Sequence, residues 1–370
     1  MRAWALQTIE PTPLGDAHLD HCLACRNCET ACPAGVKYGE LLVASRGRQR
    51  ERRGARVGQR AIEWASTRPT LLAATLATYR RLHRWLPARV RLLPRPPLLG
   101  SNAAAGGAAE RLTRTERVTL FKGCVARSYE HTLRDAVVRL CTAVGVDVVE
   151  SAGQHCCGSL HAHAGNLTGA QRLASRNRLA FGSLAQDFNA AGSAESAGPS
   201  TTVLTLASGC HQAVSDALGA PKQAMDAIAF IEARARPLRW RPCRQRVALH
   251  VPCTQRSVPG SVAALRRLLA RVPGLEVVEL DAGFGCCGAA GAQMLTDPMR
   301  ANDYRRPLLA QLQEARATRL LSANIGCRLH FANATDRVVE HPLEFLARLL
   351  DDDRPVAAPA THVLDVPSRT

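Results

Sequence analysis

The stretch Val118-Thr-Leu-Phe-Lys-Gly-Cys124 returns later in the chain as Val247-Ala-Leu-His-Val-Pro-Cys253. In both copies a short apolar run ends at a cysteine, and further matching segments follow in the same order. These segments are Val146 to Glu150 with Leu275 to Glu279, Cys156-Cys157-Gly158 with Cys286-Cys287-Gly288, and Val203 to Cys210 with Leu320 to Cys327. The matches indicate an internal duplication that runs from Val118 to about Asp352.

Each copy alternates short apolar runs with a helical pattern. In the first copy, residues 118–121, 146–149 and 202–206 are predicted strands, and residues 133–144 are a predicted helix with apolar residues at helical spacing. Strand–helix–strand order predicts a mostly parallel sheet, because parallel strands need a long crossover connection. We therefore expect an α/β fold: two tandem, duplicated α/β Cys-rich domains with parallel sheets. The N-terminal part, in which Cys22, Cys25, Cys28 and Cys32 have the spacing of a bacterial ferredoxin run, is expected to be α-helical and ferredoxin-like.

The chain divides by cysteine content and by turn-forming residues. The connector after residue 44 has no cysteine, is rich in Arg, Leu and Ala, and ends in the low-complexity stretch Ser101 to Ala109. The expected segments are half of a 4Fe-4S ferredoxin-type domain at 1–44, a helical Arg-rich connector and linker at 45–117, a first Cys-rich domain at 118–236, a second at 245–352, and a loose tail at 353–370.

The repeated cysteines each follow the end of a predicted strand. The carboxyl ends of parallel strands meet at one edge of a sheet, where ligands of α/β sheets usually bind. Adjacent cysteines strain a disulfide with each other but suit a metal cluster, and the following glycine lets the backbone pass close to it. We therefore predict one four-thiol metal site in each copy, and iron–sulfur, zinc and an empty site remain open for both. The predicted ligands are Cys124, Cys156, Cys157 and Cys210 in the first copy, and Cys253, Cys286, Cys287 and Cys327 in the second.

One histidine distinguishes the two copies at this edge. His330 lies three residues after Cys327 and is a candidate extra ligand, whereas Ala213 occupies the equivalent place after Cys210. We expect the two copies to differ in what they hold. No residue is predicted to be catalytic.

The N-terminal segment carries the most specific motif. His21-Cys22-Leu-Ala-Cys25-Arg-Asn-Cys28-Glu-Thr-Ala-Cys32-Pro33 matches the bacterial ferredoxin spacing, and it predicts a [4Fe-4S] cluster held by Cys22, Cys25 and Cys28. In two-cluster ferredoxins the fourth cysteine of such a run ligates the other cluster. Either Cys32 folds back to complete its own cluster, or the site is incomplete. We expect a preceding Cys-rich segment in a longer form of the protein.

Composition narrows the functional classes further. Fourteen cysteines without a recognisable signal peptide favour metal thiolates in a reducing cytoplasm over disulfides. No run is long and apolar enough for a membrane helix, so any membrane contact is expected to be peripheral, on the inner face of the cell membrane. The net charge of +17 comes almost entirely from arginine, and aromatic residues are scarce, so we do not expect nucleic-acid binding. The basic segments Arg46 to Arg60 and Arg80 to Arg95 are expected to be solvated faces or to meet an acidic partner or anionic headgroups.

The motifs together resemble a known family. The run Leu19 to Gly39, the stretch Phe284 to Gly291 and the stretch Ser322 to His330 resemble the iron–sulfur subunits of bacterial glycolate oxidase (glycolate dehydrogenase), within the larger family with heterodisulfide-reductase-type Cys-rich domains. The resemblance implies a complex with FAD-binding subunits that oxidise glycolate to glyoxylate. This chain would relay the electrons towards a membrane quinone and would have no substrate-oxidising site of its own.

Two departures from the family pattern leave alternatives open. The family usually has two ferredoxin runs, and the first is absent here. Its heterodisulfide-reductase relatives carry a further cysteine where this chain has Ala213 and His330. The alternatives are a heterodisulfide-reductase-like subunit with thiol or disulfide chemistry at a Cys-Cys-Gly cluster, and the equivalent relay subunit of a lactate or glycerol-3-phosphate dehydrogenase.

Overall fold

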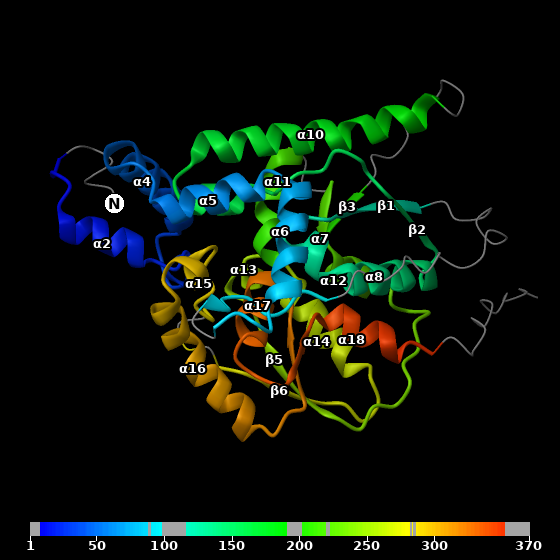
Figure 1. Ribbon diagram of the computed structural model, residues 1–370. Helices are drawn as coiled ribbons and strands as arrows, with labels where there is room; N and C mark the ends of the chain where they lie inside the picture. Colours follow the sequence, from blue (N-terminus) through cyan, green and yellow to red (C-terminus); the bar gives the residue numbers. More distant parts are fainter. Residues whose placement is uncertain are drawn as a thin grey trace, which may run out of the picture.

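A computed structural model describes residues 8–87, 90–97, 116–190, 202–219, 223–281, 283 and 286–351. The chain forms two α/β units that follow a helical N-terminal region (Figure 1). The helices are α2 (Pro13–His21), α3 (Asn27–Thr30), α4 (Tyr38–Arg53), α5 (Val57–Ser66), α6 (Pro69–Leu82), α7 (Ala126–Tyr129), α8 (His131–Ala143), α9 (Ser159–His163), α10 (Leu167–Ala190), α11 (Ser208–Leu218), α12 (Ala227–Ala233), α13 (Cys253–Arg256), α14 (Ser261–Ala270), α15 (Gln293–Thr296), α16 (Pro298–Glu314), α17 (Ile325–Ala332) and α18 (Pro342–Leu349).

Each unit contains a four-stranded parallel sheet. The strands of the first unit are β1 (Glu116–Phe121), β2 (Val146–Val149), β3 (Thr202–Thr205) and β4 (Ala224–Asp226), in the order β2-β1-β3-β4. The strands of the second unit are β5 (Arg246–His250), β6 (Glu276–Glu279), β7 (Arg319–Ser322) and β8 (Val338–Glu340), in the order β6-β5-β7-β8. All pairs are parallel, so the predicted duplication and the predicted parallel sheets are confirmed.

The strand order places a crevice in each unit. From β1 the chain crosses to β2 on one side of β1 and then returns to β3 on its other side, so the connections diverge at the carboxyl ends of β1 and β3. Such a switch point is where α/β sheets usually bind ligands. The second unit repeats the arrangement at β5 and β7. The repeated cysteines lie in the segments that leave these strand ends.

The two units share one apolar core. A single cluster of buried side chains extends from Val118 and Leu133 in the first unit to Leu249 and Phe345 in the second, and α8 packs against α18. Polar contacts join the units as well, because Ser261 Oγ donates to Asp226 Oδ2 at 2.7 Å. The relative position of the two crevices is therefore fixed by a continuous interior.

A buried ion pair also crosses between the units. The Arg328 guanidinium on α17 bonds to the Glu130 carboxylate, which lies between α7 and α8, and both side chains are almost fully buried. A buried pair of this kind is costly to break, because each charge has lost its hydration.

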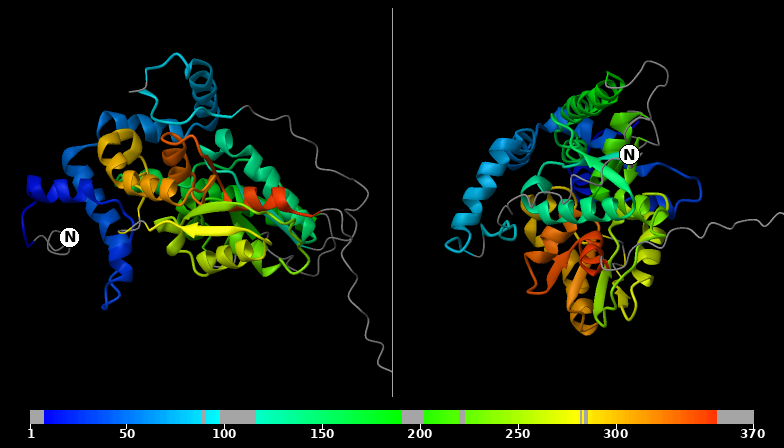
Figure 2. Two further views of the ribbon diagram at one scale, coloured as in Figure 1. Left: turned by 90° about the horizontal axis from the view of Figure 1, so that it is seen from below. Right: turned by 90° about the vertical axis from the view of Figure 1, so that its right-hand side faces the viewer.

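The helices α2, α3 and α4 project from one end of the two sheets (Figure 2). Arg46 on α4 ties them to the first unit: its guanidinium donates to the carbonyl oxygens of Leu19 at 2.7 Å, Cys22 at 2.6 Å and His163 at 2.9 Å. Gly165, with φ +72°, lies directly against this helix, and a Cβ there would come 2.3 Å from Arg46 O. Helix α4 runs through residue 44, where the sequence suggests a boundary, and the domain limits stay predictions.

The connector forms the helices α5 and α6, and the proline-rich segment after α6 contains no further α-helix among its described residues. The low-complexity stretch Ser101 to Ala109 and the tail 353–370 lie outside the described residues. Within the described part of the chain, no helix has both the length and the apolar character needed to cross a bilayer.

Candidate metal centres

The second unit brings its four repeated cysteines together at the ends of its central strands. Cys253 opens α13 directly after β5, Cys286 and Cys287 follow β6, and Cys327 lies in the first turn of α17 after β7. The thiols form a chain of contacts from Cys253 through Cys286 and Cys287 to Cys327. The set predicted from sequence is therefore one cluster in space.

Hydrogen bonds set which of these sulfurs carries negative charge most easily. The Cys253 and Cys287 thiols donate to Cys286, which lowers the pKa of Cys286 to about 3, and burial opposes the shift. Gly288 N donates to Cys286 Sγ at 3.3 Å, and Asn324 Nδ2 lies 3.4 Å from Cys327 Sγ. Backbone and amide donors aimed at sulfur favour the thiolate form, which is the form that binds metals.

The first unit repeats this cluster. Cys124 follows β1, Cys156 and Cys157 follow β2, and Cys210 lies in the first turn of α11 after β3. Contacts run from Cys124 through Cys156 and Cys157 to Cys210, and they hold the pKa of Cys157 well below its ordinary value.

A single amide side chain positions the Cys-Cys loop of the first unit. Asn177 on α10 is almost fully buried; its Nδ2 donates to Cys156 O at 2.9 Å, and its Oδ1 accepts from His155 N at 2.9 Å. The loop is thus clamped from both sides, which holds the two adjacent thiols towards the crevice.

The two clusters face each other across one cavity of about 270 Å³. Loops from the two units meet at its edge, where Ser208 N donates to Ala323 O at 3.1 Å and Gly209 N to Asn324 Oδ1 at 3.3 Å. Apolar side chains of α5 and α6 close another side. The cavity is lined by all eight repeated cysteines, together with Ile62, Leu72, Leu76 and other side chains.

The N-terminal run reaches the same place. Burial raises the pKa of Cys25, and the neighbouring thiols of Cys286, Cys22 and Cys28 raise it further, so these sulfurs lie within electrostatic reach of one another. Leu23 and Ala24 line the cavity. The ferredoxin-type run therefore lies beside the second unit's cluster.

Two residues of this run have left-handed backbone conformations. Ala24 and Arg26, on either side of Cys25, have φ of 54° and 61°. Left-handed conformations cost roughly 1–2 kcal/mol for residues with a Cβ. The cost is accepted where the surrounding structure requires it, and here it gives the tight winding of a Cys-x2-Cys-x2-Cys loop.

Cys32, the last cysteine of the run, has backbone and hydroxyl donors around its sulfur. Backbone N–H groups of Val36 and Ala34 bond to its sulfur and lower its pKa, and the Tyr38 hydroxyl adds a further bond. Donors of the same kind surround the thiolates of a metal cluster. The ligand role of Cys32 therefore stays a prediction that rests on the cysteine spacing.

Comparison with known proteins fits this geometry. Residues 118–215 and 247–332 match the family model described as the cysteine-rich domain, CCG. The chain therefore contains two copies of the CCG domain. The glycolate oxidase iron-sulfur subunit of Escherichia coli (strain K12) is 28% identical over 94% of this chain and 86% of its own length. The probable glycolate oxidase iron-sulfur subunit of Bacillus subtilis (strain 168) is 25% identical over 91% and 82%. One subunit of the anaerobic glycerol-3-phosphate dehydrogenase of E. coli (strain K12) is 25% identical over 66% and 61%.

The donor sets of both CCG domains fit a metal cluster. Each domain offers four mutually contacting thiols at a crevice, and all fourteen cysteines of the chain, which lie in described residues, are free of disulfides. Cys210 and Cys327 lie at helix amino termini, whose positive end offsets thiolate charge. Iron–sulfur and zinc both suit such thiolate sites.

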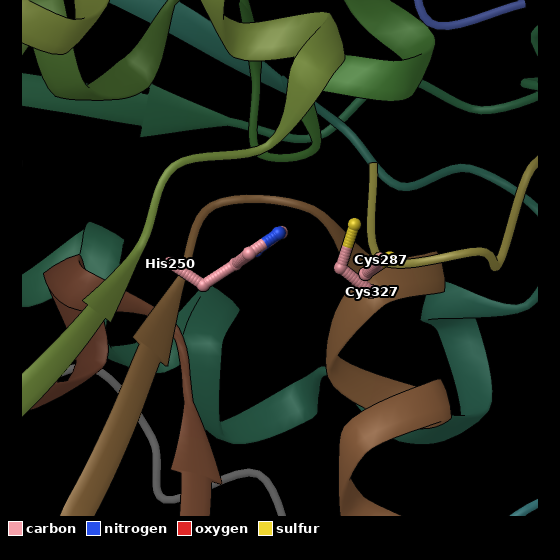
Figure 3. Close-up of side chains that lie close together, drawn as sticks. All are labelled: His250, Cys287 and Cys327. Carbon is pink, nitrogen blue, oxygen red and sulfur yellow. The ribbon is translucent and has the colours of Figure 1, made fainter. Parts of the chain in front are cut away.

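Two histidines of the second CCG domain, His330 and His250, differ in what their ring nitrogens contact. His330 Nε2 lies 3.1 Å from Ala301 O and its Nδ1 lies 3.3 Å from Arg305, so both ring nitrogens have protein neighbours. His250, which the sequence analysis did not single out, lies instead with the sulfurs of Cys287 and Cys327 (Figure 3). Burial lowers the pKa of His250 to about 4, which keeps the ring neutral. The signal that could have found it is the duplication, because His250 stands where the first copy has Phe121.

Proposed function

We propose that the chain is the iron–sulfur electron-transfer subunit of a glycolate-type 2-hydroxy-acid dehydrogenase, which relays electrons from FAD-binding subunits towards a membrane quinone. The observation that carries the proposal is the convergence of three thiol sets on one place: Cys25 lies within electrostatic reach of Cys286 and Cys253, and the two CCG sets share one cavity. A relay needs its centres close together, and a set of isolated structural metal sites does not.

The residues of the chain have defined tasks in this proposal. Bound iron–sulfur clusters would supply one-electron transfer. Cys22, Cys25 and Cys28 would hold the N-terminal [4Fe-4S] cluster, and the eight CCG cysteines would hold the other centres. Apolar side chains such as Leu23, Leu72 and Leu76 line the space between the sets. An apolar surrounding strengthens the effect of each N–H group that points at sulfur.

The same proposal includes the domain limits, the role of Cys32 and the location of the protein. Residues 1–44 would form half of a ferredoxin-type domain, and Cys32 would ligate a second cluster. The CCG domains would extend over 118–236 and 245–352. The protein would be cytoplasmic and would contact the inner face of the cell membrane peripherally.

Metal analysis of the whole chain tests the relay. Iron, sulfide and zinc are measured on anaerobically purified protein, with EPR spectra before and after reduction. We expect iron and sulfide, loss of the N-terminal signal in Cys25→Ser, and loss of a different signal in Cys253→Ser. Cys141→Ala is the matched control, because Cys141 is fully buried in the core. Zinc without iron would refute the relay.

Two alternatives share the same centres. A glycerol-3-phosphate or lactate donor is favoured if the flavin subunit that co-purifies with the chain oxidises that substrate and leaves glycolate unchanged. Thiol or disulfide chemistry at a CCG cluster is favoured by the cavity between the two sets, which has room for a small ligand. Reduction of a disulfide by the pre-reduced chain, lost in Cys287→Ser, would support that function.

Peripheral membrane contact is supported by the outer face of α6, which we define as Leu71, Ala74, Thr75, Thr78 and Leu82. These residues are exposed and share one side of the helix, while Leu76 is buried on the other. The face is less polar than its composition suggests, because the Thr75 hydroxyl donates to Leu71 O at 2.7 Å and the Thr78 hydroxyl to Ala74 O at 3.0 Å. Helix α6 lies at the margin of the molecule in both views of Figure 2.

Aromatic and basic side chains flank this face. Trp64 and Trp85 are exposed, and the guanidinium groups of Arg68 and Arg84 lie 4.4 Å and 4.9 Å from their rings. The sequence contains no acidic residue from Trp64 to Ala109. An apolar helical face with Trp and Arg at its ends suits the interface of an anionic bilayer.

Vesicle sedimentation tests this contact independently of electron transfer. The chain is mixed with phosphatidylcholine vesicles with or without phosphatidylglycerol, at rising salt. We expect salt-sensitive binding to the anionic vesicles and a loss of roughly tenfold or more in Leu71→Glu/Leu82→Glu. The matched control, Leu179→Glu/Met299→Glu, adds the same charge at exposed apolar positions on other helices and should bind normally. Equal binding by both double variants contradicts the membrane contact.

A further inference from the structure

His250 is a buried polar residue of the second CCG domain, and its position in strand β5 does not explain why a histidine stands there. It is the last residue of β5, is 1% exposed, and lies three residues before Cys253. The first domain has Phe121 at the matching place, so an apolar side chain satisfies the packing there. An imidazole at a buried strand end is unfavourable unless its nitrogens find partners.

One nitrogen of the ring has a protein partner. His250 Nδ1 lies 3.1 Å from Ser322 Oγ, at the end of the neighbouring strand β7. The ring also packs edge-on against Phe331, with ring centroids 5.0 Å apart and planes at 69°. Two neighbours therefore fix the position and the orientation of the imidazole.

The other nitrogen faces the sulfurs. His250 Nε2 is buried and has no hydrogen-bond partner among the described residues. A nitrogen of the ring and the Sγ atoms of Cys287 and Cys327 all lie within 4.8 Å of one another. Figure 3 shows the imidazole directed into the same space as the two thiols. A buried nitrogen that lacks a partner and points at a thiol pair is placed as a metal ligand would be.

We propose that His250 Nε2 is a ligand of the metal centre in the second CCG domain, alongside Cys287 and Cys327. With the ring proton on Nδ1 and donated to Ser322 Oγ, the Nε2 lone pair is left for the metal. The inference rests on the proposed metal centres, but it does not depend on electron transfer or on the substrate. His330 takes no part, because Ala301 O and Arg305 occupy its nitrogens.

The consequence is that the two CCG centres differ. Phe121 offers no donor atom, so the first centre has thiolates alone from the matching positions, while the second has a neutral imidazole among its ligands. An imidazole that takes the place of a thiolate makes a centre less negative, and imidazole-ligated iron–sulfur centres have the higher reduction potentials. The second centre would then be the better electron acceptor of the two.

Nitrogen coordination can be measured directly. The chain is labelled with 15N in its histidine rings and purified anaerobically with its own metal. Pulsed EPR is used if the metal is iron, and X-ray absorption if it is zinc. We expect an imidazole nitrogen at the metal in the unmodified chain. The signal should vanish in His250→Phe, which copies the first domain, and should persist in His330→Gln.

The outcomes separate the inference from the proposed centres. A metal bound by sulfur alone in the unmodified chain overturns the inference and leaves the proposed metal centre in place. Loss of the nitrogen signal in His330→Gln with its survival in His250→Phe has the same meaning. Absence of any metal from the second domain contradicts the proposed centre itself. Because the labelled unmodified chain gives the primary result, the inference stays testable even if a variant fails to fold.

Discussion

Gly158 and Gly288 occupy the same place in the two CCG domains, yet we expect alanine there to have different effects. Both have left-handed backbones, with φ of +91° and +88°, so the conformational cost of a Cβ, roughly 1–2 kcal/mol, is common to both. The surroundings differ. A Cβ at Gly158 would come 3.3 Å from Ala170 O, whereas a Cβ at Gly288 would come 2.3 Å from Ala301 O.

The second contact cannot be relieved by turning a side chain. Ala301 O belongs to the backbone of α16, so the helix and the Cys-Cys loop must separate. We expect Gly158→Ala to lower the free energy of unfolding by about 1–2 kcal/mol, and Gly288→Ala to lower it by about 4 kcal/mol or more. Gly288→Ala should also lose the metal of the second domain, because Gly288 N donates to Cys286 Sγ.

Anaerobic urea unfolding of both variants measures the difference, and iron, sulfide and zinc per chain report the loss of metal. Gly182→Ala is the control, because Gly182 lies in α10 with no atom within 4 Å of a new Cβ. That variant should be neutral or slightly more stable. If Gly288→Ala costs no more than Gly158→Ala, the steric reasoning is wrong.

Two further predictions concern charges buried between the units. Arg328→Met should lower the free energy of unfolding by about 3–5 kcal/mol, because it leaves the buried Glu130 carboxylate unpaired. In a double-mutant cycle, the double variant with Glu130→Gln should recover much of this loss. Full additivity of the two substitutions would argue against the pair. Burial raises the pKa of Asp226 from 3.8 to about 6, so the folded state holds this proton more tightly and stability falls as pH rises from about 4 to 6, by about 3 kcal/mol in total. Asp226→Asn should remove that slope, because asparagine does not titrate, while its side-chain oxygen still caps α12 and still accepts from Ser261. Unfolding curves between pH 4 and 8 that keep the slope in this variant would contradict the assignment.

The sequence predicted much of the fold because the relevant signals are local or repeated. The apolar runs at 118–121 and 146–149 became β1 and β2, and the helix predicted at 133–144 became α8 (His131–Ala143). The spacing of apolar residues in a segment and the length of that segment can be read from the segment alone. The duplication added a second, independent instance of the same unit, which made the parallel order visible.

The gathering of four thiols in each unit also followed from the sequence. Cysteines placed after strand ends meet at one edge of a parallel sheet whatever the details of packing. The sequence did not reveal His250, because a histidine in an apolar strand has no periodic signature. The direction of its ring depends on Ser322 and Phe331, which come from distant parts of the chain.

By itself, then, the sequence determined that this protein is a duplicated α/β chain with three sets of four cysteines, since spacing and repetition are properties of the chain. Only the tertiary structure decided that the two CCG sets face one cavity, that Cys25 reaches the second set, and that α6 covers them with an apolar face left outside. The physical reason is that these relations depend on how separate surfaces pack. The joint core from Leu133 to Phe345 fixes the angle between the units, and no local pattern encodes it.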